Sequence, residues 1–193
     1  MKKHLYWITI TLLVAGVGCK HKKSSEKKED FFPVSSFIKS QVAEIDTSLN
    51  SIKKITYIDS MHSDTEYVPR EQFKNLAKDF LDIPDLADKK YKDRYTEEKL
   101  FDETLNRAII TYKPVNPDKE ELQKQEVLIT PDPSGDKVSS IFLDWIINNK
   151  DGFLQRKLLW EVDKSFQVTT ISQKPSQPET TSILKVTWDE NKE

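Results

Sequence analysis

Two segments in the first half of the chain carry apolar residues at helical spacing. In the first segment, successive intervals of four, three, four and three residues join Ile38, Val42, Ile45, Leu49 and Ile52. Such intervals place side chains on one face of a helix, and Ser35 and Ser36 are residues that favour a helix start. The pattern predicts a helix over about residues 35–50.

The second segment begins at Pro69 and ends before Pro84. A proline is tolerated in the first turn of a helix, whereas the residue before a proline is pushed out of the helical conformation. Between these prolines, one helical face would consist of Phe73, Leu76, Ala77, Phe80 and Leu81. The chain between the two helices predicts a short strand over residues 54–59, which are rich in β-branched and aromatic types, and a polar loop over 61–66.

Residues 92–108 fit two different structures. A third helix, capped by Thr96, would place Leu100, Phe101, Thr104, Leu105 and Ala108 on one face. Alternatively, residues 94–101 and 107–113 form two strands of a hairpin that turns at 102–106. The strand-like run from Ala108 to Tyr112 and the strands that follow it favour the hairpin, and the helix stays open as the alternative.

From Glu126 onward, strand-like runs alternate with turn signals. We expect a reversal at residues 149–152 with Gly152 at positive φ, and a tight hairpin at 163–164. The predicted strands are 127–130, 138–147, 154–162, 166–171 and 182–188. Strands joined by short turns form antiparallel meanders, so the sequence predicts an α+β fold with two N-terminal helices packed on a C-terminal antiparallel β-sheet meander.

The N-terminus combines a basic start with a short apolar run. Lys2 and Lys3 precede an apolar segment, residues 5–17, which is interrupted only by two threonines. A spanning helix needs about 20 predominantly apolar residues, so this run is too short and is typical of an export signal. Small residues, 15–18, lead directly to Cys19, the single cysteine of the chain.

On these residues the chain resembles the bacterial lipoprotein precursors. The resemblance covers about the first 20 residues and implies cleavage by signal peptidase II just before Cys19, with acyl chains on the new N-terminal residue. Two or more acyl chains give stable membrane anchoring. The residue after the cysteine is Lys20 and not an acidic one, which by the same resemblance implies the outer membrane, on its periplasmic side or at the cell surface.

The predicted organisation is a signal peptide at 1–18, an acylated N-terminus and flexible tether at 19–33, and a single α+β domain at 34–190. Residues 20–30 contain no apolar side chain and mix five lysines with three acids, a composition that does not support a packed structure. Removing Lys2 and Lys3 with the signal changes the formal charge from −2 to −4. This near-neutral balance argues against a nucleic-acid partner.

The domain lacks the sequence motifs of common enzyme sites. It contains no HExxH, CxxC, GxSxG or glycine-rich phosphate motif. The histidines that follow Cys19 are His21, in the tether, and His62, in the predicted polar loop. We therefore expect no catalytic residues, no cofactor and no metal. The favoured interpretation is a non-enzymatic binding module for an envelope protein or a hydrophobic ligand, anchored through Cys19; a carboxylate-dependent hydrolase and a purely structural envelope tether are the alternatives.

Three tryptophans, Trp145, Trp160 and Trp188, lie on predicted strands near the C-terminus. They could line a hydrophobic groove, as aromatic residues do at interfaces, or form the packed core under the helices, which we favour. Asp132 and Asp136 flank a Pro-Ser-Gly sequence. They lack the alternating oxygen ligands of a calcium loop, so we interpret this segment as a turn.

Overall fold

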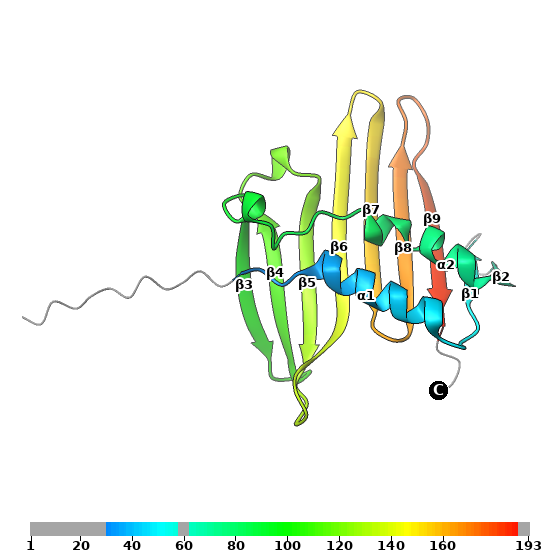
Figure 1. Ribbon diagram of the computed structural model, residues 1–193. Coiled ribbons are helices and arrows are strands. Elements are labelled where there is room, and N and C mark those ends of the chain that lie inside the picture. The colour runs from blue at the N-terminus through cyan, green and yellow to red at the C-terminus, as the bar shows by residue number, and fades with distance from the viewer. Residues whose placement is uncertain (1–29, 58–61, 189–193) are drawn as a thin grey trace, which may run out of the picture.

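The computed structural model describes residues 30–57 and 62–188. In these residues the dominant feature is one antiparallel sheet of nine strands, in the order β2-β1-β9-β8-β7-β6-β5-β4-β3 (Figure 1). Seven consecutive strands pair with their neighbours in sequence, and the N-terminal hairpin then pairs with the last strand. The strands are β1 (Lys53–Tyr57), β2 (Ser63–Tyr67), β3 (Tyr95–Asp102), β4 (Arg107–Pro114), β5 (Leu122–Thr130), β6 (Lys137–Asn149), β7 (Gly152–Glu161), β8 (Ser165–Gln173) and β9 (Thr180–Thr187).

Two helical segments cross the same face of this sheet (Figure 1). The first is α1 (Val34–Thr47), whose buried residues include Ile38, Val42 and Ile45. The second contains η1 (Arg70–Gln72), α2 (Phe73–Leu76) and α3 (Lys78–Leu81), and it continues to η2 (Lys89–Tyr91). A further turn of 3-10 helix, η3 (Pro117–Lys119), connects β4 to β5.

The predicted fold class, two N-terminal helices on a C-terminal meander, is wrong, because the described domain is predominantly a β-sheet. α1 is the only helix of more than four residues in the described part of the chain. The predicted second helix breaks at Ala77, whose ψ of 6° separates α2 from α3. Phe73, Ala77 and Phe80 of the predicted face are nevertheless buried, because a chain of short turns can bury them as well as one continuous helix would.

The sheet also contains a strand that the sequence pattern did not predict. Residues 61–66 were expected to be a polar loop, yet β2 covers most of them and is exposed at all five positions. It pairs with β1 from Lys53↔Tyr67 to Tyr57↔Ser63, and Lys54 and Glu66 form an ion pair of 2.6 Å. β2 is therefore a strand because its backbone pairs with β1, although its sequence has no alternation of apolar and polar residues.

The hairpin interpretation of residues 92–108 is confirmed. β3 and β4 pair continuously from Tyr95↔Pro114 to Asp102↔Arg107. The turn places Asn106 at a φ of 48°, a conformation that asparagine tolerates better than most residues. The expected positive φ of Gly152, at the β6–β7 turn, is also confirmed at 132°.

The core lies between the sheet and the helical segments, and its centre is aromatic. Phe80 stands edge-on to Trp160 with ring centroids 5.2 Å apart, and Phe73 does the same to Trp188 at 5.2 Å. Trp160 stacks on Phe166 at 5.5 Å. These residues are at most 2% exposed, and each well-oriented aromatic pair adds about 0.5–1.5 kcal/mol beyond its buried area.

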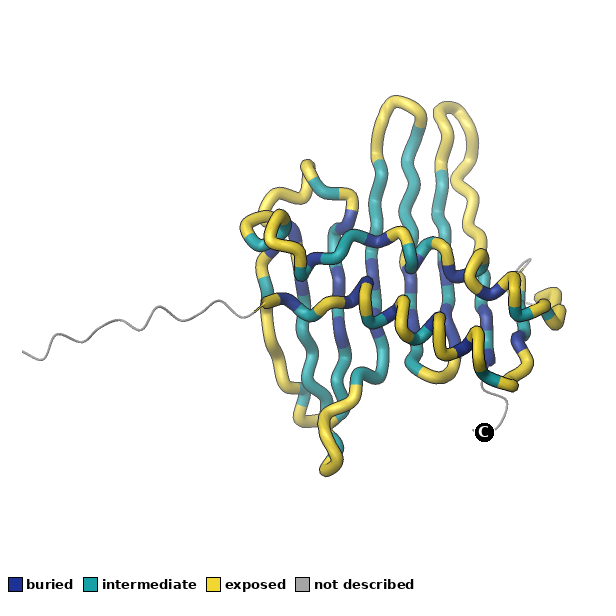
Figure 2. The backbone as a smooth tube through the Cα atoms, viewed as in Figure 1, coloured by how far each residue is buried: buried dark blue, intermediate teal, exposed yellow. Residues whose placement is uncertain are grey.

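Burial is confined to the part of the sheet that the helical segments cover. Figure 2 shows buried positions along the middle of the strands, whereas the β6–β7 and β8–β9 turns project beyond the cover and are exposed. At one end of the covered region, Trp145 and Ile147 on β6 and Arg156 on β7 are only partly buried.

Candidate binding cleft at Trp145

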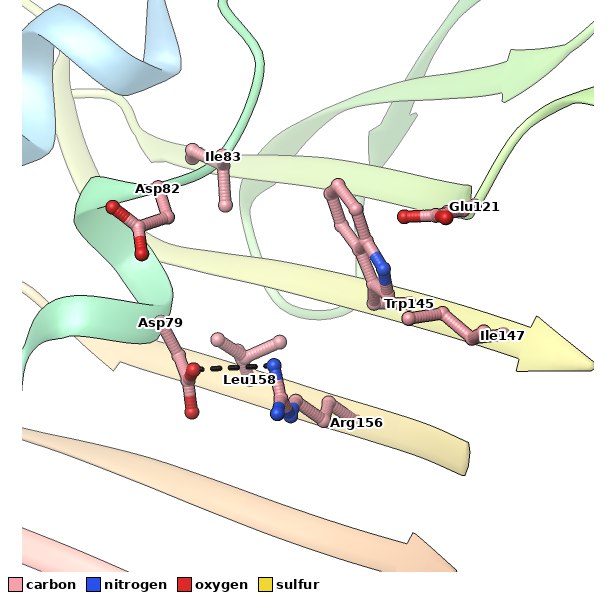
Figure 3. Close-up of a pocket in the computed structure, with 8 residues that line it drawn as sticks. All are labelled: Asp79, Asp82, Ile83, Glu121, Trp145, Ile147, Arg156 and Leu158. Carbon is pink, nitrogen blue, oxygen red and sulfur yellow. Dashed lines mark ion pairs between the residues drawn. The ribbon is translucent and has the colours of Figure 1, made fainter. Parts of the chain in front are cut away.

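A cleft lies where the chain leaving α3 passes over β5, β6 and β7 (Figure 3). Its first hollow has a volume of about 200 Å³ and is lined by Asp79, Asp82, Ile83, Glu121, Trp145, Ile147, Arg156 and Leu158. A second hollow of about 440 Å³ shares Asp82, Glu121 and Trp145 with the first. We refer to the two connected hollows as the Trp145 cleft.

Strand alternation and register place Trp145 in this cleft. On β6 it follows Ile141 and Leu143 at alternate positions on the inner face, and both of those residues are 0% exposed. Trp145 pairs with Leu122 on β5 and with Arg156 on β7. Trp145 is only partly buried because it lies at the margin of the helical cover.

Glu121 is held beside Trp145 by the backbone. The Ile146 amide donates to the Glu121 carbonyl oxygen at 2.8 Å, which extends the β5–β6 pairing by one residue. On the opposite side of the indole, Asp82 follows the last turn of α3. The indole of Trp145 therefore shares one hollow with two carboxylates that come from distant parts of the chain.

The charges in the first hollow are only partly balanced. Arg156 pairs with Asp79 at 3.3 Å, linking β7 to α3 (Figure 3). Asp82 and Glu121 are both exposed, and within the described residues neither forms an ion pair. This leaves two negative charges beside an aromatic face and an apolar floor of Ile83, Ile147 and Leu158.

A hydrogen-bonded network forms the wall of the second hollow. The Arg94 guanidinium donates to the two carboxylate oxygens of Glu120 at 2.7 and 2.6 Å. The Tyr95 hydroxyl donates to the Leu122 carbonyl oxygen at 3.1 Å and lies 3.3 Å from Glu120. A phenol with its ordinary pKa is already neutral near pH 7, and burial, followed by the Glu120 carboxylate, raises the pKa of Tyr95 further.

The structure separates the three tryptophans that the sequence grouped. Trp160 is 0% and Trp188 is 2% exposed, and both belong to the packed core, whereas Trp145 lines the cleft. No pattern in the sequence indicated that the cleft would also be lined by Asp79, Asp82, Glu121 and Arg156. They come from three separate segments with no motif spacing, so only the register of β6 against its neighbours brings them together.

The sequence also singled out Cys19 and the acidic residues Asp132 and Asp136. Cys19, with the signal peptide and most of the tether, lies outside the described residues. Asp132 accepts hydrogen bonds from the Ser134 backbone and hydroxyl and pairs with Lys137 at 2.9 Å. These contacts, led by the Ser134 hydroxyl, lower the pKa of Asp132, as expected of a carboxylate that stabilises a turn.

The described residues contain neither a cluster of metal-ligating side chains nor a membrane-spanning helix. Across residues 30–57 and 62–188, no three His, Cys, Asp or Glu side chains are grouped as a metal site would require. In the same residues no helix has the length and apolar character needed to cross a bilayer. Comparisons with protein-family models, curated proteins and solved structures gave no match.

Proposed function

We propose that this protein is a lipid-anchored envelope protein that acts by binding, without catalysis, through the Trp145 cleft. The anchor is the acylated Cys19 expected from the sequence. The single observation that carries the binding role is a partly buried tryptophan in an open cleft, which it shares with Asp82 and Glu121, two carboxylates without ion-pair partners in the described chain.

The chemistry of the first hollow of the cleft favours a ligand that carries a positive charge next to an apolar group. A cation over an indole face is stabilised by about 0.5–2 kcal/mol, and the carboxylates of Asp82 and Glu121, which line the same hollow, would attract it as well. Ile83, Ile147 and Leu158 would receive the apolar part of the ligand. A lysine or arginine side chain of a partner protein combines these properties.

Binding is favoured over the alternative of a carboxylate hydrolase. A general acid that works near neutral pH is usually held in an apolar pocket that keeps it protonated. Asp82 and Glu121 are exposed to water, and Asp79 is engaged by Arg156. A purely structural tether would need no such cleft, so this alternative is also less favoured.

A fluorescence titration tests the binding role. A tri-arginine peptide added to the protein is expected to change the tryptophan emission with saturation, because Trp145 is the partly exposed tryptophan of the described domain. The double variant Asp82→Asn, Glu121→Gln should weaken binding at least tenfold. Glu98→Gln, an exposed carboxylate on β3, is the matched control and should bind as the wild type does.

Two results would contradict the proposal: equal binding of a tri-glutamate peptide, or unchanged tri-arginine binding by the double variant. The anchor is tested separately with Cys19→Ala, which should leave an unprocessed chain without acyl groups by mass spectrometry. A Cys19→Ala chain of mature mass would show that cleavage and anchoring do not depend on this residue.

A further inference from the structure

The tip of the β3–β4 hairpin carries apolar side chains exposed to solvent. Leu100 is 60%, Phe101 is 51% and Leu105 is 59% exposed. These three account for nearly half of the large hydrophobic residues that are exposed in the described chain, and they lie within six positions. Isolated exposed apolar residues are ordinary, but a concentration at one end of a hairpin indicates an interaction site.

The tip, which we define as residues 100–105, is held in one conformation. Asp102 accepts hydrogen bonds from the backbone amides of Thr104 at 2.9 Å and Leu105 at 3.1 Å. Its carboxylate is therefore engaged within the turn. Because the turn is already ordered, binding through Leu105 would require little further loss of conformational freedom.

The arrangement of the side chains argues against a flat protein partner. Leu100 and Phe101 are neighbours on β3, and neighbouring strand residues project to opposite faces of a sheet. A second sheet or a helix would cover one of these faces, and a strand paired with the free edge of β3 would run along residues 95–102 and not along the turn that carries Leu105. A medium that surrounds the end of the hairpin, such as the interface of a bilayer, contacts both faces and Leu105 together.

The chain enters the domain beside this hairpin. Asp30 pairs with Lys92, and the Phe31 ring lies 4.9 Å from the ring of Tyr112 on β4. Asp30 and Lys99 also line the same hollow, and Lys99 immediately precedes Leu100. Eleven residues join Cys19 to Asp30 (30 − 19 = 11), which at full extension reach about 36–40 Å.

From these observations we propose that the β3–β4 tip inserts into the interface of the membrane that carries the acylated Cys19. The tether is long enough for the tip and the anchor to engage one bilayer, and tethering raises the effective concentration of the tip at the surface. Glu103 adds an exposed negative charge to the tip. Anionic lipid would repel this charge, so we expect the tip to bind neutral lipid. The Trp145 cleft would then remain available to a partner.

This inference rests on the proposed anchor, and the experiment separates the two. An acylated Cys19 has no free thiol, so the full chain carrying Leu105→Cys would take up one thiol-reactive, environment-sensitive fluorophore. Lys150→Cys, at the β6–β7 turn on the opposite end of the sheet (Figure 1), is the matched control. Two labels per chain would mean that Cys19 is free and that the anchor is wrong, independently of the tip.

In vesicles of phosphatidylcholine, the label at position 105 is expected to shift its emission to shorter wavelength. It should also be quenched several-fold more by spin-labelled lipid than the label at position 150. Equal quenching at the two positions would overturn the inference. So would a shift of the position-105 label in a lipid-free dimer, since a second copy would then cover the tip.

If Cys19 proves to be free, the tip is tested in the Cys19→Ser chain by flotation with the same vesicles. Replacing Leu100, Phe101 and Leu105 by serine should reduce the bound fraction at least tenfold. These positions are exposed, so the variant should keep the far-ultraviolet circular dichroism of the parent chain. Unchanged flotation of the serine variant would refute the inference.

Discussion

Gly152 allows the tight turn between β6 and β7 because it has no side chain. Its φ of 132° is one that residues with a Cβ rarely adopt, and a Cβ built there would lie 2.3 Å from the Gln173 carbonyl oxygen. Gly135 has a similar φ of 127°, but a Cβ there would meet no atom within 4 Å. The two glycines therefore share the conformational requirement and differ in the space around them.

We expect Gly152→Ala to lower the free energy of unfolding more than Gly135→Ala does. Backbone strain costs about 1–3 kcal/mol at either position, and the clash with Gln173 adds about 1–3 kcal/mol at Gly152. Urea unfolding of both variants measures the difference. Equal losses would mean that the β8 end of the sheet moves to accommodate the methyl group.

Trp145 and Trp160 differ in exposure because they lie at different places relative to the helical cover. Trp145 and Trp160 occupy inward positions on neighbouring strands, yet only Trp160 lies under Phe73 and Phe80. The residue type and the strand alternation are the same in both cases. Exposure of Trp145 is therefore a property of the packed structure, and the sequence could not distinguish these residues.

At the scale of elements, the segment of residues 70–81 is attached to the sheet through two aromatic anchors. Phe73 and Phe80 are both 0% exposed. Phe80 lies 5.2 Å from Trp160 and 5.3 Å from Phe166, measured between ring centroids. Helices as short as α2 and α3 have little stability alone, so these contacts provide most of what holds the segment in place.

Phe80→Ala is expected to lower the free energy of unfolding by about 3–5 kcal/mol, the usual effect of deleting a buried ring. Near-ultraviolet circular dichroism should weaken as well, because Trp160 loses its edge-to-face neighbour. Lys78→Ala, an exposed position on α3, is the control and should change stability by less than about 0.5 kcal/mol. A similarly small loss for Phe80→Ala would show that the segment contributes little to the core.

At the scale of the whole molecule, the Tyr95 network links the first strand of the meander, β3, to the start of β5. Burial and the nearby Glu120 carboxylate raise the pKa of Tyr95, and burial raises that of Tyr112. In the unfolded chain a tyrosine titrates near pH 10. The contribution of the neutral phenols to stability is therefore fully present below about pH 10 and is lost as the pH rises towards the higher pKa values of the folded state.

We expect the wild-type protein to lose stability above about pH 10, and Tyr95→Phe to lose less over the same range. Tyr95→Phe will also be less stable at neutral pH, because the hydrogen bond to the Leu122 carbonyl is absent. Denaturant unfolding at pH 7, 10 and 11 measures both effects. An equally steep alkaline loss in the variant would assign the effect to Tyr112 and to the other groups that titrate in this range.

The sequence by itself determined most of the local structure. Helical spacing marked α1, turn residues marked the reversals from β5 to β9, and the hairpin interpretation of residues 92–108 was correct because strand-like residues on either side outweighed a short helical stripe. These features depend on side-chain periodicity and turn chemistry, which are local properties. The lipid attachment at Cys19 stays a prediction.

Only the tertiary structure decided the class of the fold and the location of the cleft. The polar strand β2 exists because β1 supplies its backbone partners, and β1 in turn pairs with β9, more than 100 residues later in the chain. The break at Ala77 and the grouping of Asp82, Glu121 and Trp145 likewise depend on contacts between distant segments. Such contacts form when strands align in register and helices pack over them, and no spacing along a single segment encodes that alignment.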